Sequence, residues 1–140
     1  FPVGTGSAAD IRLADTTAQA LRAGIDAATV GHRIGDISAA IGAIARAAGY
    51  GLHTDFGGHG IGRAMHEAPA VPNNGRAGRG FPLRPGLVIA IEPWFLAGGV
   101  DAYAIDDDGW TLRSTDGSRG AHQEHTVAVA EDGPVVLTVP

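Results

Sequence analysis

The sequence predicts an α+β domain in which helices pack on an antiparallel sheet. Two observations support this prediction. Apolar residues recur at helical spacing in the N-terminal third, and short apolar runs separated by glycine-containing turns follow in the rest of the chain. Two helices followed by a set of strands is an order typical of the α+β class. The chain shows neither an internal repeat nor a low-complexity linker.

The first helix is expected from Ser7 to about Thr29, with the Ser7 hydroxyl as its N-cap. The apolar residues predicted to share its buried face are Ile11, Ala14, Ala18, Leu21 and Ile25. Asp36 is expected to cap a second helix, which ends before Gly49 at the C′ position. The buried side of this second helix is predicted to contain Ile37, Ile41 and Ile44.

The strands are expected after a glycine-rich, irregular stretch at residues 51–69. The run Leu87–Glu92 is almost continuously apolar up to its last residue, which is typical of a buried strand. Other segments predicted to be strands are Trp110–Arg113, His125–Ala130 and Val135–Val139. Turns are expected at Pro72–Gly75 and, as a hairpin, at Glu131–Gly133.

Composition excludes several classes of protein. The 140 residues are 44% hydrophobic and 18% charged, which indicates one globular domain with a core. The net charge of −5 argues against nucleic acid as a partner, and no apolar run approaches the roughly 20 residues of a membrane span. The absence of cysteine excludes disulfides, thiolate nucleophiles and thiolate zinc sites. A metal would therefore be held by His, Asp and Glu.

The residues that could carry chemistry stand at the ends of the predicted elements. His59 and His66 lie in the glycine-rich stretch GGHGIGRAMHEAP, Glu92 closes the strand VIAIE, and Glu124 opens the strand HTVAVA. Side chains at element ends can converge, and imidazole together with carboxylate suits zinc, manganese, iron or cobalt. We therefore expect His59, Glu92 and Glu124 to converge on a metal, with His66 facing the same cleft.

Other interpretations of these residues stay open at this point. Glu92 could lie in water at the sheet edge, and His66 could be a surface or core histidine with one hydrogen bond. We expect three other histidines, His32, His53 and His122, to be surface or linker residues without a role. A phosphate-binding loop at GHGIG is disfavoured because no apolar strand precedes it, and no GxSxG nucleophile elbow occurs.

Three blocks of the chain resemble the C-terminal half of type I methionine aminopeptidases. The blocks are GHGIGRAMHEAPAVPN, LRPGLVIAIEP and DGWTLRSTDGSRGAHQEHTVAVAEDG, in the family's order and spacing. The likeness spans essentially the whole chain. Xaa-Pro dipeptidases and creatinase-like proteins share the first two blocks, whereas DGWT and EHTVAV are similar to methionine aminopeptidases in particular.

The resemblance implies a pita-bread fold around a site with two divalent metal ions, which could be cobalt, manganese, iron or zinc. It implies that His59, Glu92 and Glu124 are metal ligands, with Glu124 bridging and Glu92 also moving a proton. It implies that His66 hydrogen-bonds the scissile peptide, and that Met65 and Trp110 lie along the pocket for the methionine side chain.

The function that the resemblance implies is removal of the initiator methionine from new chains whose second residue is small. The partners would be N-terminal methionines of peptides and nascent proteins, with neither nucleic acid nor membrane as a substrate. The parent enzyme would be a cytoplasmic monomer, and association with the ribosome stays open.

The chain departs from the family pattern in its aspartates. The family site also uses two aspartates and a further histidine from its N-terminal half. No aspartate of this chain matches those positions, because Asp10 and Asp15, for example, lie in the first helix. We therefore expect residues 1–140 to be the C-terminal portion of a single catalytic domain that holds three of five ligands and is inactive alone. The alternative is a non-catalytic pita-bread module that binds a peptide or a protein.

Overall fold

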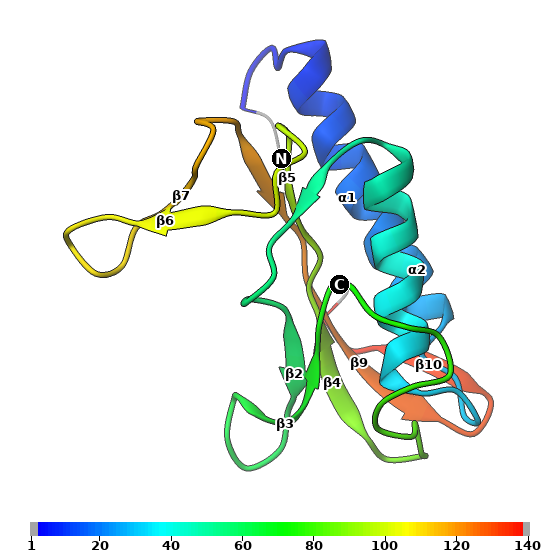
Figure 1. Ribbon diagram of the computed structural model, residues 1–140. Coiled ribbons are helices and arrows are strands. Elements are labelled where there is room, and N and C mark those ends of the chain that lie inside the picture. Colours follow the sequence, from blue (N-terminus) through cyan, green and yellow to red (C-terminus); the bar gives the residue numbers. More distant parts are fainter. Residues whose placement is uncertain (1–2, 139–140) are drawn as a thin grey trace.

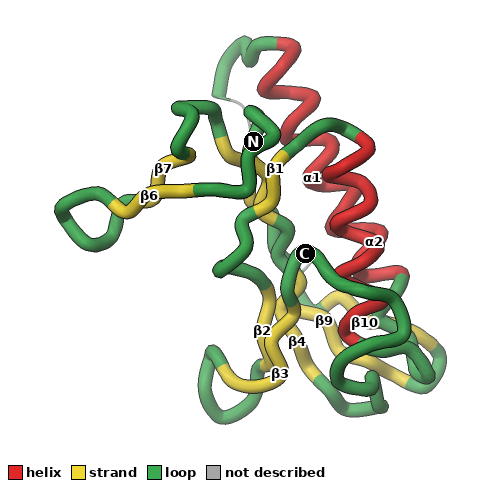
Figure 2. The backbone as a smooth tube through the Cα atoms, in the orientation of Figure 1, coloured by secondary structure: helices red, strands yellow, loops and turns green. Residues whose placement is uncertain are grey.

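The computed structural model describes residues 3–138 and has the expected α+β architecture. Two helices lie side by side along antiparallel strands, and one hairpin projects away from them (Figure 1, Figure 2). The elements are, in chain order, α1 (Ala8–Asp26), α2 (Ile34–Ala47), β1 (Gly51–Leu52), β2 (Gly58–Gly60), β3 (Glu67–Val71), β4 (Val88–Ile91), β5 (Trp94–Leu96), β6 (Tyr103–Ile105), β7 (Leu112–Ser114), β8 (Gly120–His122), β9 (His125–Ala130) and β10 (Gly133–Val136).

Helix α1 begins as the sequence predicts, but its buried face is rotated. The Ser7 hydroxyl accepts a hydrogen bond from the Asp10 amide at 3.1 Å, which confirms the N-cap. Ile11 is exposed, so the predicted face is wrong at that position. The buried residues are Leu13, Thr17, Ala20, Leu21 and Gly24. Apolar periodicity misses this face because it includes Thr17, whose hydroxyl is satisfied by donating to the Leu13 carbonyl at 2.8 Å.

Helix α2 begins two residues before the predicted Asp36 cap. Arg33 is the N-cap residue, and Asp36 is the third helical residue, whose carboxylate accepts from the Arg33 amide at 2.7 Å. This bond and a second from the Gly78 amide hold the pKa of Asp36 below its ordinary range. The helix end is as predicted, with Gly49 following at a φ of 74°.

The strands form three antiparallel groups. The largest sheet has the order β10-β9-β4-β2-β3, a second has the order β1-β5-β8, and β6 pairs with β7 in the projecting hairpin. Strand β9 has the predicted bounds, whereas the strand predicted at Trp110–Arg113 forms as β7, two residues later. The strand predicted at Val135–Val139 forms as β10, and Val139 lies outside the described residues.

Residues 51–69 are more regular than expected, because they contain β1, β2 and the start of β3. Strands β5, β6 and β8 were also not predicted. Each of these unpredicted strands except β3 has two or three residues, too few to show a period of two. Such strands form because neighbouring strands, distant in sequence or across a hairpin, supply their hydrogen bonds.

The glycines beside His59 are required by close packing rather than by positive φ. A Cβ added at Gly58 would stand 2.1 Å from the Ala90 carbonyl oxygen, and one added at Gly60 would stand 2.2 Å from that of Ala68. Neither residue has a positive φ. Glycine therefore lets β2 pass between β3 and β4, and this position aims the His59 ring at the end of β4.

The core lies between the helices and the large sheet. Ile37 and Ile41 of α2 are fully buried together with Ile89 and Ile91 of β4 and Val127 of β9. Burial of these side chains fixes the end of β4, and so the position of Glu92, against the helices. Within residues 3–138, no helix has the length and apolarity needed to cross a membrane.

Candidate metal centre

Three residues from separate strands converge at one end of the large sheet. His59 lies in β2, Glu92 follows β4 directly, and Glu124 precedes β9. The pairings Gly60 with Ile89 and Ile91 with His125 bring these positions into register. One ligand atom from each of the three side chains lies within 4.8 Å of the others. The three side chains therefore converge as predicted, and their binding of a metal stays a prediction.

The contact between His59 and Glu92 favours a cation between their side chains. The Nδ1 atom of His59 lies 3.0 Å from the Gly60 carbonyl oxygen and must donate to it, because a carbonyl only accepts. A neutral ring then presents the lone pair of Nε2 to Glu92 Oε1, at 3.3 Å. Two acceptors that face each other need a proton or a metal ion between them. Both side chains are only 15% exposed, which strengthens this requirement.

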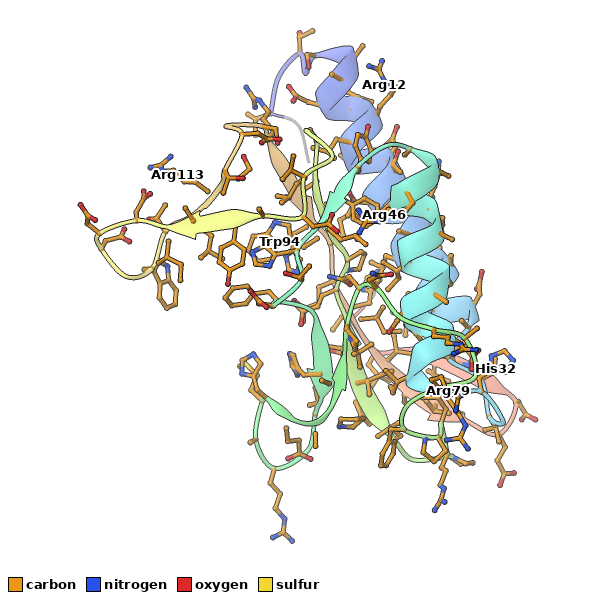
Figure 3. All side chains as sticks on the ribbon, in the orientation of Figure 1. Arg12, His32, Arg46, Arg79, Trp94 and Arg113 are labelled. Atoms are coloured by element: carbon orange, nitrogen blue, oxygen red, sulfur yellow. The ribbon has the colours of Figure 1, made fainter. Side chains whose placement is uncertain are left out.

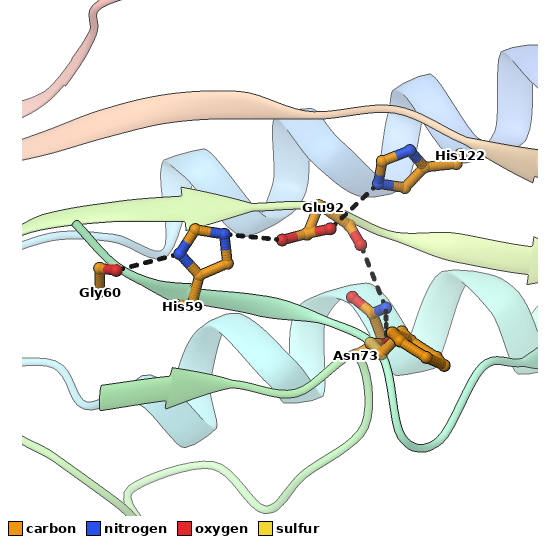
Figure 4. A network of polar contacts seen from close by, with 6 residues as sticks. His59, Gly60, Asn73, Glu92 and His122 are labelled. Carbon is orange, nitrogen blue, oxygen red and sulfur yellow. Dashed lines mark hydrogen bonds and ion pairs between the residues drawn. The ribbon is translucent and has the colours of Figure 1, made fainter. Parts of the chain in front are cut away.

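His122 belongs to the same network, although the sequence suggested a surface residue without a role. Its Nε2 lies 3.2 Å from Glu92 Oε2, so the Glu92 carboxylate is held between two histidines (Figure 4). The pairing of Trp94 in β5 with His122 in β8 places it there. The expectation for His122 is therefore wrong. The sequence could not show this, because β8, the strand that positions His122, is too short to predict.

Asn73 is a further residue that sequence reasoning missed. The sequence predicts a turn here and no role for this side chain, yet Asn73 is buried, and its Nδ2 donates to the Glu92 carbonyl at 3.1 Å and to the Phe56 carbonyl at 3.3 Å. Asn73 therefore holds the backbone carbonyl of Glu92, while the carboxylate contacts His59 and His122 (Figure 4). The only sequence signal was its place in the block GHGIGRAMHEAPAVPN.

The other predicted site residues lie closer to the surface. His66 is exposed in the β2–β3 connection, with its ring centroid 4.2 Å from that of His59. Glu124 is also exposed. Met65 and Trp110 are 74% and 86% exposed, so the described residues do not enclose either side chain. Their role beside a methionine side chain stays a prediction, as does the role of His66 in catalysis.

His53 is buried, not a surface residue as expected. Only 2% of it is exposed, and its ring lies among Phe56, Trp94 and Tyr103, with centroid separations of 4.7, 4.7 and 4.1 Å. Burial lowers the pKa of His53, partly opposed by the charge of Asp55. His32 is exposed as expected, with its Nδ1 2.9 Å from the Ala27 carbonyl.

A helix-on-sheet scaffold that holds one imidazole and two carboxylates within 4.8 Å of one another has the donor set of a metal-binding protein. The comparison with family models gives the particular family. The model of metallopeptidase family M24 matches residues 1–131, and the chain belongs to this family.

Relatives and solved structures of the family agree with this assignment. The chain is 47% identical over 145 residues to methionine aminopeptidase 1 of Mycobacterium tuberculosis, covering 99% of the chain and 54% of the relative. It is also 47% identical over 139 residues to methionine aminopeptidase A of Synechocystis, with the same shares covered. The crystal structure of methionine aminopeptidase from Thermotoga maritima superposes with a TM-score of 0.95 at 37% identity, covering 100% of this chain and 56% of that one.

The fold is therefore the pita-bread fold, as the resemblance implied. The chain spans about half the length of the curated relatives it matches. Membership of a metallopeptidase family also agrees with the donor set, because imidazole nitrogen and carboxylate oxygen are ligands for divalent ions.

Proposed function

We propose that residues 1–140 form the C-terminal portion of the catalytic domain of a methionine aminopeptidase, which removes the initiator methionine from proteins. The observation that carries this proposal is the convergence of His59, Glu92 and Glu124 within 4.8 Å. It occurs in a chain that is 47% identical to proteins named methionine aminopeptidase.

The donor set divides into a fixed part and an open part. The Gly60 carbonyl holds the His59 ring through Nδ1, and His122 contacts the Glu92 carboxylate. Glu124 is exposed, so it is free to bridge two ions. Two divalent ions, of cobalt, manganese, iron or zinc, would polarise the scissile carbonyl and acidify a water. Three protein ligands do not fill two coordination spheres, and the rest of such an enzyme would supply further carboxylates.

Two side chains are placed to move protons and to bind the reacting group. Glu92 accepts the proton of the attacking water and delivers it to the amine nitrogen as the peptide C–N bond breaks. His66, beside His59, donates a hydrogen bond to the carbonyl oxygen as negative charge develops on it. Met65 and Trp110 would contact the methionine side chain once the rest of the enzyme covers them.

The substrates under this proposal are peptides and nascent proteins with an N-terminal methionine and a small second residue. The enzyme would act as a monomer in the cytoplasm. Whether it binds the ribosome is a separate question that co-sedimentation would answer.

The test compares methionine release by the full-length gene product and by residues 1–140. Each is supplied with cobalt or manganese and a Met-Ala-Ser peptide. We expect release only by the full-length product, and we expect Glu92→Gln to lower it by about 10²–10⁴ while the exposed control Glu131→Gln keeps it. Absence of release from any Met-Xaa or Xaa-Pro peptide, with peptide binding retained, would favour the non-catalytic module. Release by residues 1–140 near the full-length rate would show that three protein ligands suffice.

A further inference from the structure

Asn73 joins the two chain segments that carry His59 and Glu92. Its amide nitrogen bears two protons, and it donates to the Phe56 carbonyl at 3.3 Å and to the Glu92 carbonyl at 3.1 Å. Phe56 lies in the loop that leads into β2, the strand of His59, whereas Glu92 directly follows β4. One side chain therefore connects the two strands that bring these residues to the metal centre (Figure 4).

The orientation of the Asn73 amide follows from its surroundings. If the amide were reversed, Oδ1 would face two carbonyl oxygens and neither hydrogen bond could form, because all three atoms only accept. In the observed orientation, Oδ1 is buried and has no hydrogen-bond partner within residues 3–138. A buried acceptor without a partner lowers the stability of the fold. The contribution of Asn73 therefore lies in the two bonds that Nδ2 donates.

The backbone of Asn73 is tightly packed, which fixes the place of its amide. Asn73 is only 2% exposed. A Cβ added at Gly42, a buried residue of α2, would stand 3.3 Å from the Asn73 carbonyl oxygen. A Cβ added at Gly57, at the start of β2, would stand 3.5 Å from the Asn73 amide nitrogen. Asn73 therefore packs closely against both α2 and the chain entering β2, and its side chain is held in place for both carbonyls.

We propose that Asn73 is a positioning residue of the metal centre, and this role rests on the proposed function. By holding the chain before His59 and the backbone of Glu92, Asn73 sets the separation of His59 Nε2 and Glu92 Oε1, which is 3.3 Å here. A metal ion needs its ligand atoms placed to within about 0.2 Å. Loss of the two bonds lets β2 and the end of β4 shift relative to each other, which weakens metal binding.

Two variants remove these bonds in different ways. Asn73→Asp keeps the shape of the side chain but replaces the donor with a carboxylate oxygen, which faces the two carbonyls as a third acceptor. Asn73→Ala removes the amide and leaves no charge at this buried position, so the test does not depend on the folding of Asn73→Asp. Thermal unfolding of each variant measures how much stability it loses.

Two controls separate positioning from a general loss of stability. Asn74→Ala changes the neighbouring asparagine, which is exposed. Leu83→Ala removes a buried core side chain near the start of α2, where the Leu83 amide donates to the His32 carbonyl. Figure 3 shows His32 well separated from Trp94, which lies on the chain that continues from Glu92. Leu83→Ala therefore lowers stability without touching the metal centre.

The first measurement is the metal affinity of the full-length gene product, by calorimetric titration with manganese below the unfolding temperature of every variant. We expect both Asn73 variants to lower the affinity by about 10–100-fold, the range found for groups that orient metal ligands. Asn74→Ala and Leu83→Ala should match wild type. The visible absorption of the cobalt-loaded protein reports ligand geometry and should change only in the Asn73 variants. Wild-type affinity in the Asn73 variants, or an equal loss in Leu83→Ala, overturns the proposal.

The second measurement is methionine release, which separates this proposal from the proposed function. Because Nδ2 of Asn73 bonds to backbone carbonyls, we expect Asn73→Ala to recover part of its lost kcat as manganese is raised, with KM for Met-Ala-Ser unchanged. Weakened metal binding in the Asn73 variants, without methionine release by wild type, supports the positioning role and overturns the proposed function. Methionine release by wild type, with metal affinity unchanged in the Asn73 variants, supports the proposed function and overturns the positioning role.

Discussion

The two oxygens of the Glu92 carboxylate face histidines of different character. Oε1 faces His59, which sits in β2 and whose Nδ1 donates to the Gly60 carbonyl beside it. Oε2 faces His122, which ends β8 and is exposed. The His59 side is fixed by glycines that let three strands pack closely, whereas the His122 side opens on a cavity lined by aromatic residues. The comparison shows that close strand packing fixes one side of Glu92, whereas the other side is open.

Glu92→Gln tests both sides at once and should have the largest effect. Methionine release should fall by about 10²–10⁴, because a neutral amide neither accepts the proton nor binds metal as a carboxylate does. Steady-state kinetics and calorimetric titration with manganese measure the two losses. The exposed Glu131→Gln variant, in the β9–β10 turn, should match wild type. Full activity in Glu92→Gln would remove this residue from the mechanism.

His66→Ala tests whether the His59 side contains a catalytic donor in addition to a ligand. We expect kcat to fall by on the order of 10²–10³ with metal affinity retained, since the proposed hydrogen bond forms with the developing oxyanion. The measurements are kcat and metal affinity, with His32→Ala as an exposed control. A collapse of metal affinity would instead indicate that His66 binds the metal. His66 and His59 would then have the same role.

His122→Ala should separate the two sides of Glu92. His122 contacts the second oxygen of Glu92, and if Glu92 is a metal ligand as proposed, loss of such a partner costs about 10–100-fold in metal affinity or activity. The same change at His59 removes a direct donor and should cost more. His122→Gln, which still offers an N–H, should recover part of the loss. Metal titrations of the three variants check this order. Equal losses at His59 and His122 would contradict the assignment of different roles.

The pH dependence of stability should show the smallest effect and concerns the cavity side. Burial holds the pKa of His53 in the folded chain below its ordinary value of 6.5. Between the folded and the unfolded pKa, His53 is therefore protonated in the unfolded chain but neutral in the folded chain. Stability should therefore be full above about pH 6.5 and fall as the pH drops toward the folded pKa. Urea unfolding between pH 5 and 8 measures this slope. His53→Phe should flatten it, whereas His32→Phe, at an exposed histidine, should leave it in place; equal slopes in wild type and His53→Phe would refute the burial argument.

Much of the fold follows from local patterns. The Ser7 cap, the Gly49 helix end and the bounds of β9 depend on residues close together in the chain, so they are predictable from it. The buried face of α1 is not predictable in this way. Burial of Thr17 depends on a hydrogen bond to its own helix and on the residues that pack against it. The sequence identifies Asp36 as a capping residue but predicts it at the N-cap, whereas it is the third helical residue. The two positions differ only in backbone geometry, which the sequence does not show.

The sequence by itself determined which residues could form the metal centre. His59, Glu92 and Glu124 stand in motifs specific enough to indicate both their chemistry and their family. Only the tertiary structure decided what surrounds them. His122, Asn73 and His53 reach their places through pairings and contacts between segments 19 to 41 residues apart, namely Asn73 with Glu92, His122 with Glu92 and His53 with Trp94. The contacts of His53 and His122 form because β1, β5 and β8 pair, and strands of two or three residues carry no periodic signal in the sequence.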